Sequence, residues 1–259
     1  MILASYTLWL REIVRFYRQR SRIAGALGSP LVFWFLIGSG LGRSFHAGPA
    51  LPLAGGYLEY FYPGTLALIV LFTAIFSTIS IVEDRQEGFL QGVLVAPVPR
   101  TAIVLGKILG GTTLAVMQAA IFLLLAPLAH VGLHLDDVPG LVGVLFILSF
   151  GLTGLGFLIA WWLNSTQGFH AIMNLFLIPM WILSGALFPS GGAAGWIRGL
   201  MLVNPLTYGV SGLRAFFYDQ SLTGEPPVAL AVAILVLFAA VMLAAGGVAV
   251  RRQGLTAAD

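Results

Sequence analysis

The sequence has few charged residues and no cysteine. Asp, Glu, Lys and Arg together make up 9% of its 259 residues, whereas a soluble globular domain has about 25%. Hydrophobic residues make up 59%, so polar groups cannot cover a globular surface, and water is excluded as the main solvent of the chain. The lack of cysteine excludes disulfides, thiolate metal sites and a cysteine nucleophile, and it says nothing about compartment.

The basic residues do not form one soluble face. The net charge is +3, but the arginines are dispersed around apolar segments, which argues against a nucleic-acid partner. The first long apolar run begins at Ile23, after five arginines, and this order is wrong for a cleavable signal peptide. We therefore expect the first span to stay in the mature protein.

Six apolar runs, each of about the 20 residues that cross a bilayer, predict an all-α membrane protein with six transmembrane helices in a single domain over residues 1–259. Pro30, Pro127 and Pro179 lie inside or near the ends of these runs and are expected to kink them. The runs are 23–42, 62–82, 104–128, 140–163, 169–188 and 228–250.

Residues 5–22 predict an amphipathic helix on the membrane surface. Arginines recur every three or four residues on one side of it, and the other side carries an apolar stripe. The alternative is a basic tail beside the membrane without a special role. The stripe consists of Tyr6, Trp9, Leu10, Ile13, Phe16 and Tyr17.

The distribution of Lys and Arg predicts the orientation. Ten lie in the N-terminal segment, the 83–107 segment and the C-terminus, whereas Arg43, Arg198 and Arg214 fall on the other side. The positive-inside rule then places both termini in the cytoplasm, and an even number of spans requires the same result.

Two connections are longer than a hairpin needs. Residues 83–100, expected in the cytoplasm, begin with charged residues and a helical pattern, and Pro97-Val98-Pro99 is expected to end that helix. Residues 189–227, expected outside, contain an apolar stretch that Asn204-Pro205 interrupts. We predict a re-entrant helical hairpin there, which protein must cover at its broken turn. Residues 83–100 suit docking on another protein, or are an ordinary solvated loop helix.

Four stretches, in order, resemble ABC-2 type transporter permeases. EDRQEGFLQGVLVAPVPRTAIVLGK (83–107) contains an acidic-basic cluster, an E-x-G, an L-V-x-P-V-x-R and a following G-K. FYPGTLAL (61–68), LSGALFP (183–189) and NPLTYGVSGLRAFF (204–217) are the other three. The resemblance covers nearly the whole chain and agrees with the six-span topology.

The resemblance implies a homodimer in the cytoplasmic (inner) membrane, with two copies of a separate cytoplasmic ABC ATPase. It implies outward movement of an amphipathic or lipid-like substrate. The ATPase contact would comprise Glu83, Asp84, Arg85, Glu87 and Gly88, with Arg100 and Lys107 anchoring the return to the membrane. The external hairpin would contain Asn204, Pro205, Tyr208 and Arg214.

No nucleotide site is expected in this chain. A phosphate-binding loop needs G-x-x-x-x-G-K-[ST], and the only Gly-Lys pair, Gly106-Lys107, has Thr101 and Ile108 at the other required positions. We expect no cofactor bound by the chain, because ATP and Mg would be bound by the partner ATPase. Membrane lipid is the other expected partner.

Two other classes of protein remain as alternatives. An intramembrane metal-dependent enzyme could use His130 and His134, four residues apart, although polar interfacial histidines explain them as well. A serine protease would pair Ser184 with His170, but 14 residues of helix separate them by roughly 21 Å, so no catalytic residue is expected. An ion-coupled secondary transporter commonly needs ionisable residues at mid-membrane depth, and none is expected here.

Polar residues within the spans are candidates for a substrate path. Such groups more often hydrogen-bond neighbouring helices, so packing remains the alternative for each of them. The candidates are Thr73, Ser77, Gln118 and Asn174, together with Thr78.

Overall fold

A computed structural model describes residues 2–18, 20–41, 56–218 and 225–256, and all regular elements within these ranges are helices. Arg43, residue 19 of the expected surface helix and residues 219–224 of the expected external region lie outside the described residues. The α-helices are α1 (Ile2–Arg18), α2 (Arg20–Leu41), α3 (Tyr57–Ser77), α4 (Ile79–Gln86), α5 (Phe89–Val95), α6 (Arg100–Leu123), α7 (Val138–Trp162), α8 (Thr166–Trp181), α9 (Gly195–Val203), α10 (Pro205–Phe217) and α11 (Val228–Thr256). Shorter turns are η1 (Ala126–Ala129), η2 (Ile182–Ala186) and η3 (Ser190–Gly192).

Five helical segments among the described residues are long and apolar enough to cross a membrane, and each overlaps one of the six expected runs; that they cross a membrane stays a prediction. The first run falls in α2, where Pro30–Gly40 is a shorter apolar helix among the described residues; its crossing stays a prediction. The five segments are Tyr57–Gln86, Arg100–Leu123, Val138–Trp162, Thr166–Ala186 and Val228–Arg252.

Two of the expected runs end differently from the prediction. The third expected run, 104–128, falls in α6, which ends at Leu123. Pro127 lies in the 3₁₀ turn η1 and has no amide hydrogen with which to continue α6. Pro179 lies near the end of α8, and the π-helical turn η2 follows it. Gly185 within η2 has φ of 82°, a conformation that glycine adopts without steric cost.

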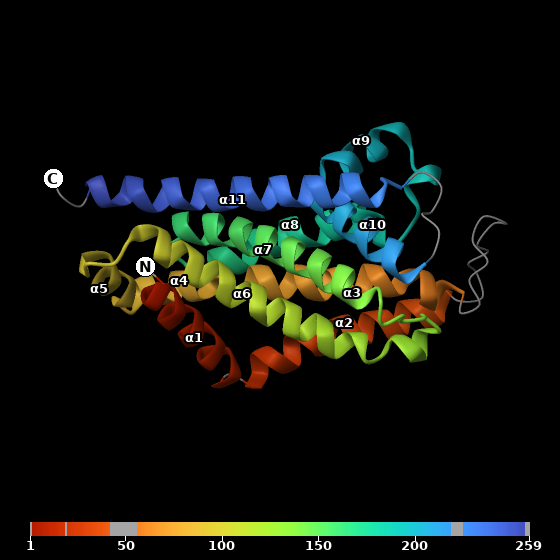
Figure 1. Ribbon diagram of the computed structural model, residues 1–259, viewed down its shortest axis with the longest axis horizontal. Helices are drawn as coiled ribbons and strands as arrows, with labels where there is room; N and C mark the ends of the chain where they lie inside the picture. Colours follow the sequence, from red (N-terminus) through yellow and green to blue (C-terminus); the bar gives the residue numbers. More distant parts are fainter. Residues whose placement is uncertain (1, 19, 42–55, 219–224, 257–259) are drawn as a thin grey trace.

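The helices form one elongated bundle with α3 inside and α11 along its side (Figure 1). In the most apolar part of the α3–α4 span 83% of residues are buried, against 11% for α11. Aromatic side chains fix α3 to its neighbours: the Tyr62 hydroxyl donates to the Phe122 carbonyl over 2.9 Å, and the two rings stack. The start of α1 and the end of α11 lie at the same end of the bundle as α4 and α5, and α9 and α10 lie at the opposite end (Figure 1).

Helix α1 packs obliquely against α6 with a face that differs from the expected apolar stripe (Figure 1). It buries Leu8, Glu12 and Phe16, at a spacing of four residues, and of the expected stripe only Phe16 is buried. Tyr6, Leu10 and Tyr17 of that stripe are exposed. A helix therefore covers residues 5–18 of the predicted 5–22, and its position at a membrane surface stays a prediction.

Gly64 provides a test of how tightly this bundle is packed. A Cβ at Gly64 in α3 would lie 2.6 Å from the Cβ of Ala186, whereas a Cβ at Gly143 in α7 would meet nothing within 4 Å. We expect Gly64→Ala to lower the free energy of unfolding by about 1–3 kcal/mol, because overpacking strains its neighbours. Gly143→Ala is the matched control and should be neutral or slightly stabilising.

Thermal unfolding in detergent micelles measures the difference between the two variants. Equal stability of Gly64→Ala and Gly143→Ala would contradict the close approach of α3 to η2.

Candidate functional site

Residues 83–100, which were expected to form one helix that docks on another protein, contain the end of α4 and all of α5. Helix α4 follows α3 after Thr78, the chain turns at Gly88, which has φ of 76°, and α5 follows. The structure confirms that the helix ends before Pro97-Val98-Pro99, because α5 stops at Val95. The left-handed conformation of Gly88 separates α4 from α5, and the sequence pattern alone did not reveal this turn.

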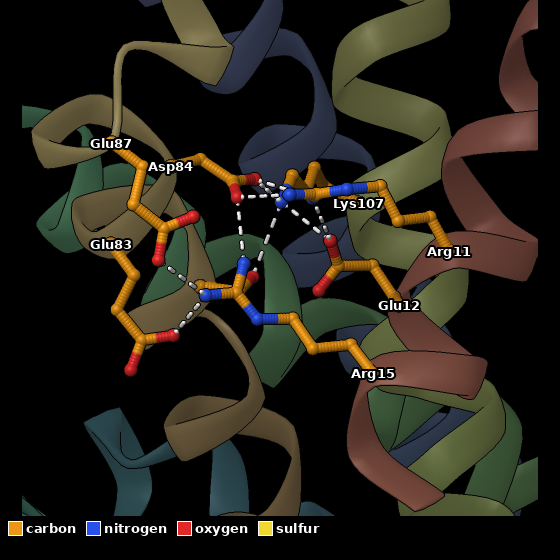
Figure 2. Close-up of polar contacts among 8 residues, drawn as sticks. Arg11, Glu12, Arg15, Glu83, Asp84, Glu87 and Lys107 are labelled. Atoms are coloured by element: carbon orange, nitrogen blue, oxygen red, sulfur yellow. Dashed lines mark hydrogen bonds and ion pairs between the residues drawn. The ribbon is translucent and has the colours of Figure 1, made fainter. Parts of the chain in front are cut away.

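Asp84 is the centre of a buried ion-pair cluster, which consists of Arg11, Glu12, Arg15, Glu83, Asp84, Glu87 and Lys107 (Figure 2). The Asp84 side chain has 0% exposure. Arg11 binds it in bidentate fashion, with Nη1–Oδ2 and Nη2–Oδ1 distances of 2.8 and 2.6 Å. Arg15 donates to Oδ1 over 2.7 Å, and Lys107 donates to Oδ2 over 2.5 Å. One carboxylate therefore joins α1, α4 and α6.

Lys107 binds a second buried carboxylate, which sequence reasoning missed. Its Nζ lies 2.5 Å from Oε1 of Glu12 and 3.2 Å from Oγ of Ser80. The side chains of Lys107 and Glu12 are 4% and 6% exposed, so neither charge is well hydrated. The available signal was the position of Glu12 midway between Leu8 and Phe16, on the face of the helix that α6 covers.

Two glycines in α6 let α1 come close enough for these pairs. A Cβ at Gly106 would lie 2.7 Å from the Cβ of Leu8, and a Cβ at Gly110 would lie 2.7 Å from the Cβ of Glu12. Small residues at a helix interface allow backbones to approach closely in membranes. The position of α1, and with it of Arg11 and Arg15, depends on this glycine spacing.

The cluster continues from buried Asp84 to an exposed edge. Arg15 lies 2.8 Å from Glu83 and 3.5 Å from Glu87, and the Arg11 guanidinium lies 3.8 Å from the centre of the Phe89 ring. Partial burial tends to lower the pKa of Arg11, but the hydrogen bond to Asp84 and the charges of Asp84, Glu12 and Glu87 raise it above its ordinary value. Arg11 is therefore a permanent cation between α1 and α5.

Two further arginines fix the same end of the bundle to carbonyl groups. Arg85 donates to the Trp161 and Leu163 carbonyls, at the end of α7, over 2.5 and 2.9 Å. Arg100, at the start of α6, donates to the Val250 carbonyl of α11 over 3.0 Å. Cations near the last carbonyls of a helix are stabilising. These contacts connect α4 with α7, and α6 with α11.

The residues expected to touch an ATPase differ in exposure. Asp84 and Lys107 are buried, and Arg85 is partly buried against α7. Glu87 is exposed, with 61% of its side chain accessible, and so are Phe89 and Val95 of α5. The contact itself stays a prediction, and the exposed face of α5 is the surface on which it would form.

The expected hairpin residues lie at the opposite end of the bundle. Asn204 separates α9 from α10, accepts the Leu206 amide over 3.0 Å and donates to the Met180 carbonyl over 2.6 Å. Pro205 is the first residue of α10, and the Tyr208 hydroxyl donates to the Leu202 carbonyl over 2.7 Å. A helix therefore lies on each side of Asn204, as predicted; entry into a membrane leaflet stays a prediction.

Arg214 fixes this hairpin to three other segments. It is buried, pairs with Glu225, and donates to the Gly185 carbonyl over 2.8 Å. Its guanidinium lies 4.2 Å from the centre of the Tyr60 ring. The sequence placed Arg214 on the less basic side of the protein without indicating its burial.

The residues predicted to line a substrate path do not share one surface. The Thr73 hydroxyl donates to Gln118 Oε1 inside the bundle, and the Ser77 hydroxyl donates to the Ala74 carbonyl over 2.7 Å. Asn174 is exposed on α8. The assignment of these residues to a substrate path stays a prediction. The bonds of Thr73 and Ser77 are contacts inside the bundle, which is what the alternative role in helix packing predicts.

His130 and His134 lie in the connection between α6 and α7. Among the described residues, no group of three or more His, Asp or Glu side chains is arranged to hold a metal ion.

The chain belongs to the ABC-2 type transporter family. The sequence pattern of that family matches residues 4–218, which include α1, the Asp84 cluster and the α9–α10 hairpin. This confirms the resemblance of the four motifs and defines the chain as a multi-pass membrane protein of a transport-permease family.

Three relatives illustrate the range of similarity. A protein of Cyanophora paradoxa, named as the transport permease ycf38, is 27% identical over 83% of this chain and 74% of its own length. YbhR of Escherichia coli, named as a multidrug ABC transporter permease, is 25% identical over 59% of this chain and 42% of its own length. Nodulation protein J of Sinorhizobium fredii is 24% identical over 91% of this chain and 85% of its own length.

The pairing of Glu12 with Lys107 can be tested by a double-variant cycle. Lys107→Met should lower the free energy of unfolding by about 3–5 kcal/mol, because buried Glu12 then keeps only the 3.5 Å pair with Arg11 and Asp84 loses one of its three cations. Glu12→Gln/Lys107→Met should lose less than the single variant, because the unpaired charge is then absent. Equilibrium unfolding in mixed micelles gives the coupling energy; independent effects of the two substitutions would contradict the pairing.

Proposed function

We propose that this chain is the membrane-spanning permease subunit of an ATP-driven exporter. It moves an amphipathic or lipid-like substrate outward, and a separate cytoplasmic ABC ATPase binds ATP and Mg and hydrolyses the ATP. Two copies of the chain and two copies of the ATPase form the transporter in the cytoplasmic (inner) membrane. The chain itself performs no catalysis and binds no cofactor.

The observation that carries this proposal is the exposed face of α5 beside the buried Asp84 cluster. Glu87, which follows α4, lies two residues before Phe89, and together with Phe89 and Val95 of α5 it gives this surface one charge and two apolar groups, a composition that suits docking in a groove of another protein. Behind it, Asp84 connects the same segment to α1 and α6. A force on α5 would therefore reach three helices at once.

The dimer and the substrate class have support from the outer faces of the bundle. Helix α8 exposes Leu175, Phe176 and Ile178 next to the polar Asn174. Such a face fits either lipid tails or a second copy of the chain, and an amphipathic molecule would meet both apolar and polar groups there. The orientation with α5 and both termini in the cytoplasm is supported by the excess of Lys and Arg at that end.

Glu87→Lys tests the docking of an ATPase on α5. The variant should insert normally, because Glu87 is exposed, but it should lose binding of the ATPase or its coupling to transport, since the charge at the contact is reversed. Asp136→Lys is the matched control, because Asp136 is an exposed carboxylate in the connection between α6 and α7. Glu83→Lys should also lose coupling, but it breaks in addition the 2.8 Å pair with Arg15, because the Glu83 side chain is only 21% exposed.

An ABC ATPase from the same genome is co-purified with each variant, and hydrolysis is measured in lipid nanodiscs with and without the chain. If Glu87→Lys retained the ATPase and stimulated its hydrolysis as the parent does, the docking role of α5 would be wrong.

Cysteine substitutions test the orientation directly, because the parent sequence has no cysteine. Val95→Cys in α5 and Leu135→Cys before α7 introduce thiols at sites that are 86% and 87% exposed. A membrane-impermeant maleimide added to intact cells should label position 135 and not position 95. The opposite pattern would reverse the proposed topology and exclude a cytoplasmic ATPase at α5.

A further inference from the structure

The second span contains a break that proline and glycine do not explain. Helix α3 ends at Ser77 and α4 begins at Ile79, although no Pro or Gly occurs between Leu66 and Gln86. The Thr78 amide bonds to the Ile75 carbonyl, and the Ile81 amide bonds to the Thr78 carbonyl, both over 3.0 Å. These bonds span three residues instead of four, and a short 3₁₀ turn within a helix often marks a hinge.

Two hydroxyl groups stabilise this break. The Ser77 hydroxyl donates to the Ala74 carbonyl over 2.7 Å, and the Thr78 hydroxyl donates to the Ile75 carbonyl over 2.6 Å. Both bonds compete with the backbone amides that would continue an α-helix, and such bonds bend helices. Thr78 has ψ of −8°, whereas an α-helical residue has ψ of about −42°.

Glycines of two neighbouring helices face these hydroxyl-bearing residues. A Cβ at Gly111 in α6 would collide with Ser77 Oγ and would lie 2.6 Å from Cγ2 of Thr153. A Cβ at Gly156 in α7 would lie 2.8 Å from Oγ1 of Thr78. The two glycines therefore let α6 and α7 lie directly against the break, and neither residue places a side chain between the helices at this point.

Polar contacts hold together the part of the protein on the α5 side of this break. The Asp84 cluster joins α1, α4 and α6, and Arg85 joins α4 to the end of α7. On the other side, α3 is fixed by apolar and aromatic packing, with Tyr60 and Tyr62 fully buried. The residues between these two parts are Ser77 at the end of α3, Thr78 directly after it, Gly111 in α6 and Gly156 in α7.

We propose that Ser77 and Thr78 form a hinge, at which the α4–α5 segment tilts together with α1, the start of α6 and the end of α7. The role of this hinge in transport rests on the proposed function, because an ATPase that moves α5 would bend the chain at Ser77 and Thr78. The hydroxyl bonds interrupt the α-helical hydrogen bonding at this point, and Gly111 and Gly156 place only backbone against it.

Distances between spin labels test the hinge without any knowledge of the substrate. The cysteine-free parent receives Val95→Cys and Leu124→Cys, at sites that are 86% and 78% exposed and lie on opposite sides of the break. Labelled chains are diluted with unlabelled ones in lipid nanodiscs, so that pulsed electron paramagnetic resonance reports the distance within one chain. Ser77→Ala/Thr78→Val removes both hydroxyls and keeps the approximate side-chain volume.

We expect the distance distribution of the parent to be broad and to narrow in the double variant, because α3 and α4 then continue as one helix. Thr78→Val alone should narrow the distance distribution less than the double variant does. Thr65→Val is the matched control: Thr65 also donates to a carbonyl of α3, that of Phe61, over 3.1 Å, but no break occurs there. It should leave the distribution as in the parent. Equal widths in the parent and the double variant would overturn the hinge.

A second measurement separates the hinge from the proposed function. With the ATPase bound and trapped by ATP and vanadate, the distance in the parent should shift, and the double variant should bind the ATPase but lose the shift. A shift of equal size in the double variant would overturn the hinge. Failure of the parent to bind any ATPase would contradict the proposed function and leave the comparison of widths as the test of the hinge.

Discussion

The pairing of the Asp84 carboxylate is the constraint on which the α5 end of the protein depends. A carboxylate with no exposure to solvent is costly unless cations and hydrogen-bond donors surround it, and Arg11, Arg15 and Lys107 meet this need from two helices. The amphipathic helix α1 is thereby part of the bundle, and Gly106 and Gly110 of α6 supply the close approach that the pairing requires.

The pairing of Asp84 also holds in place the segment that carries the exposed face of α5. Apolar packing between helices is non-directional, whereas the bidentate pair of Arg11 with Asp84 has a fixed geometry. Because this pair fixes α4 to α1, the α4–α5 segment would keep its orientation relative to α1 when another protein binds α5. Arg85 and Arg100 extend the same principle to α7 and α11 through carbonyl groups, so charge organises one end of a protein that is otherwise largely apolar.

Hydropathy predicted long apolar helices at five of the six expected runs, because a bilayer requires such helices and few other sequence patterns resemble them. Proline and asparagine signals also placed the end of α5 and the break at Asn204. The sequence did not show the partners of the charges. Glu12 was overlooked and Asp84 was assigned to a surface, because an ion pair between residues 73 or 95 positions apart depends on tertiary packing that periodicity does not encode.

The Arg214–Glu225 pair has a consequence for how the chain is assembled. Its two members are 11 residues apart in the sequence, so they can meet as soon as that short stretch has been synthesised. Carrying a lone guanidinium through an apolar environment is costly, and early neutralisation by a near neighbour reduces that burden. The cations around Asp84, by contrast, must wait for distant parts of the chain. Residue 107 is nevertheless synthesised before residues 214 and 225, so the Asp84 cluster can form first and the Arg214–Glu225 pair later, each from its own part of the chain.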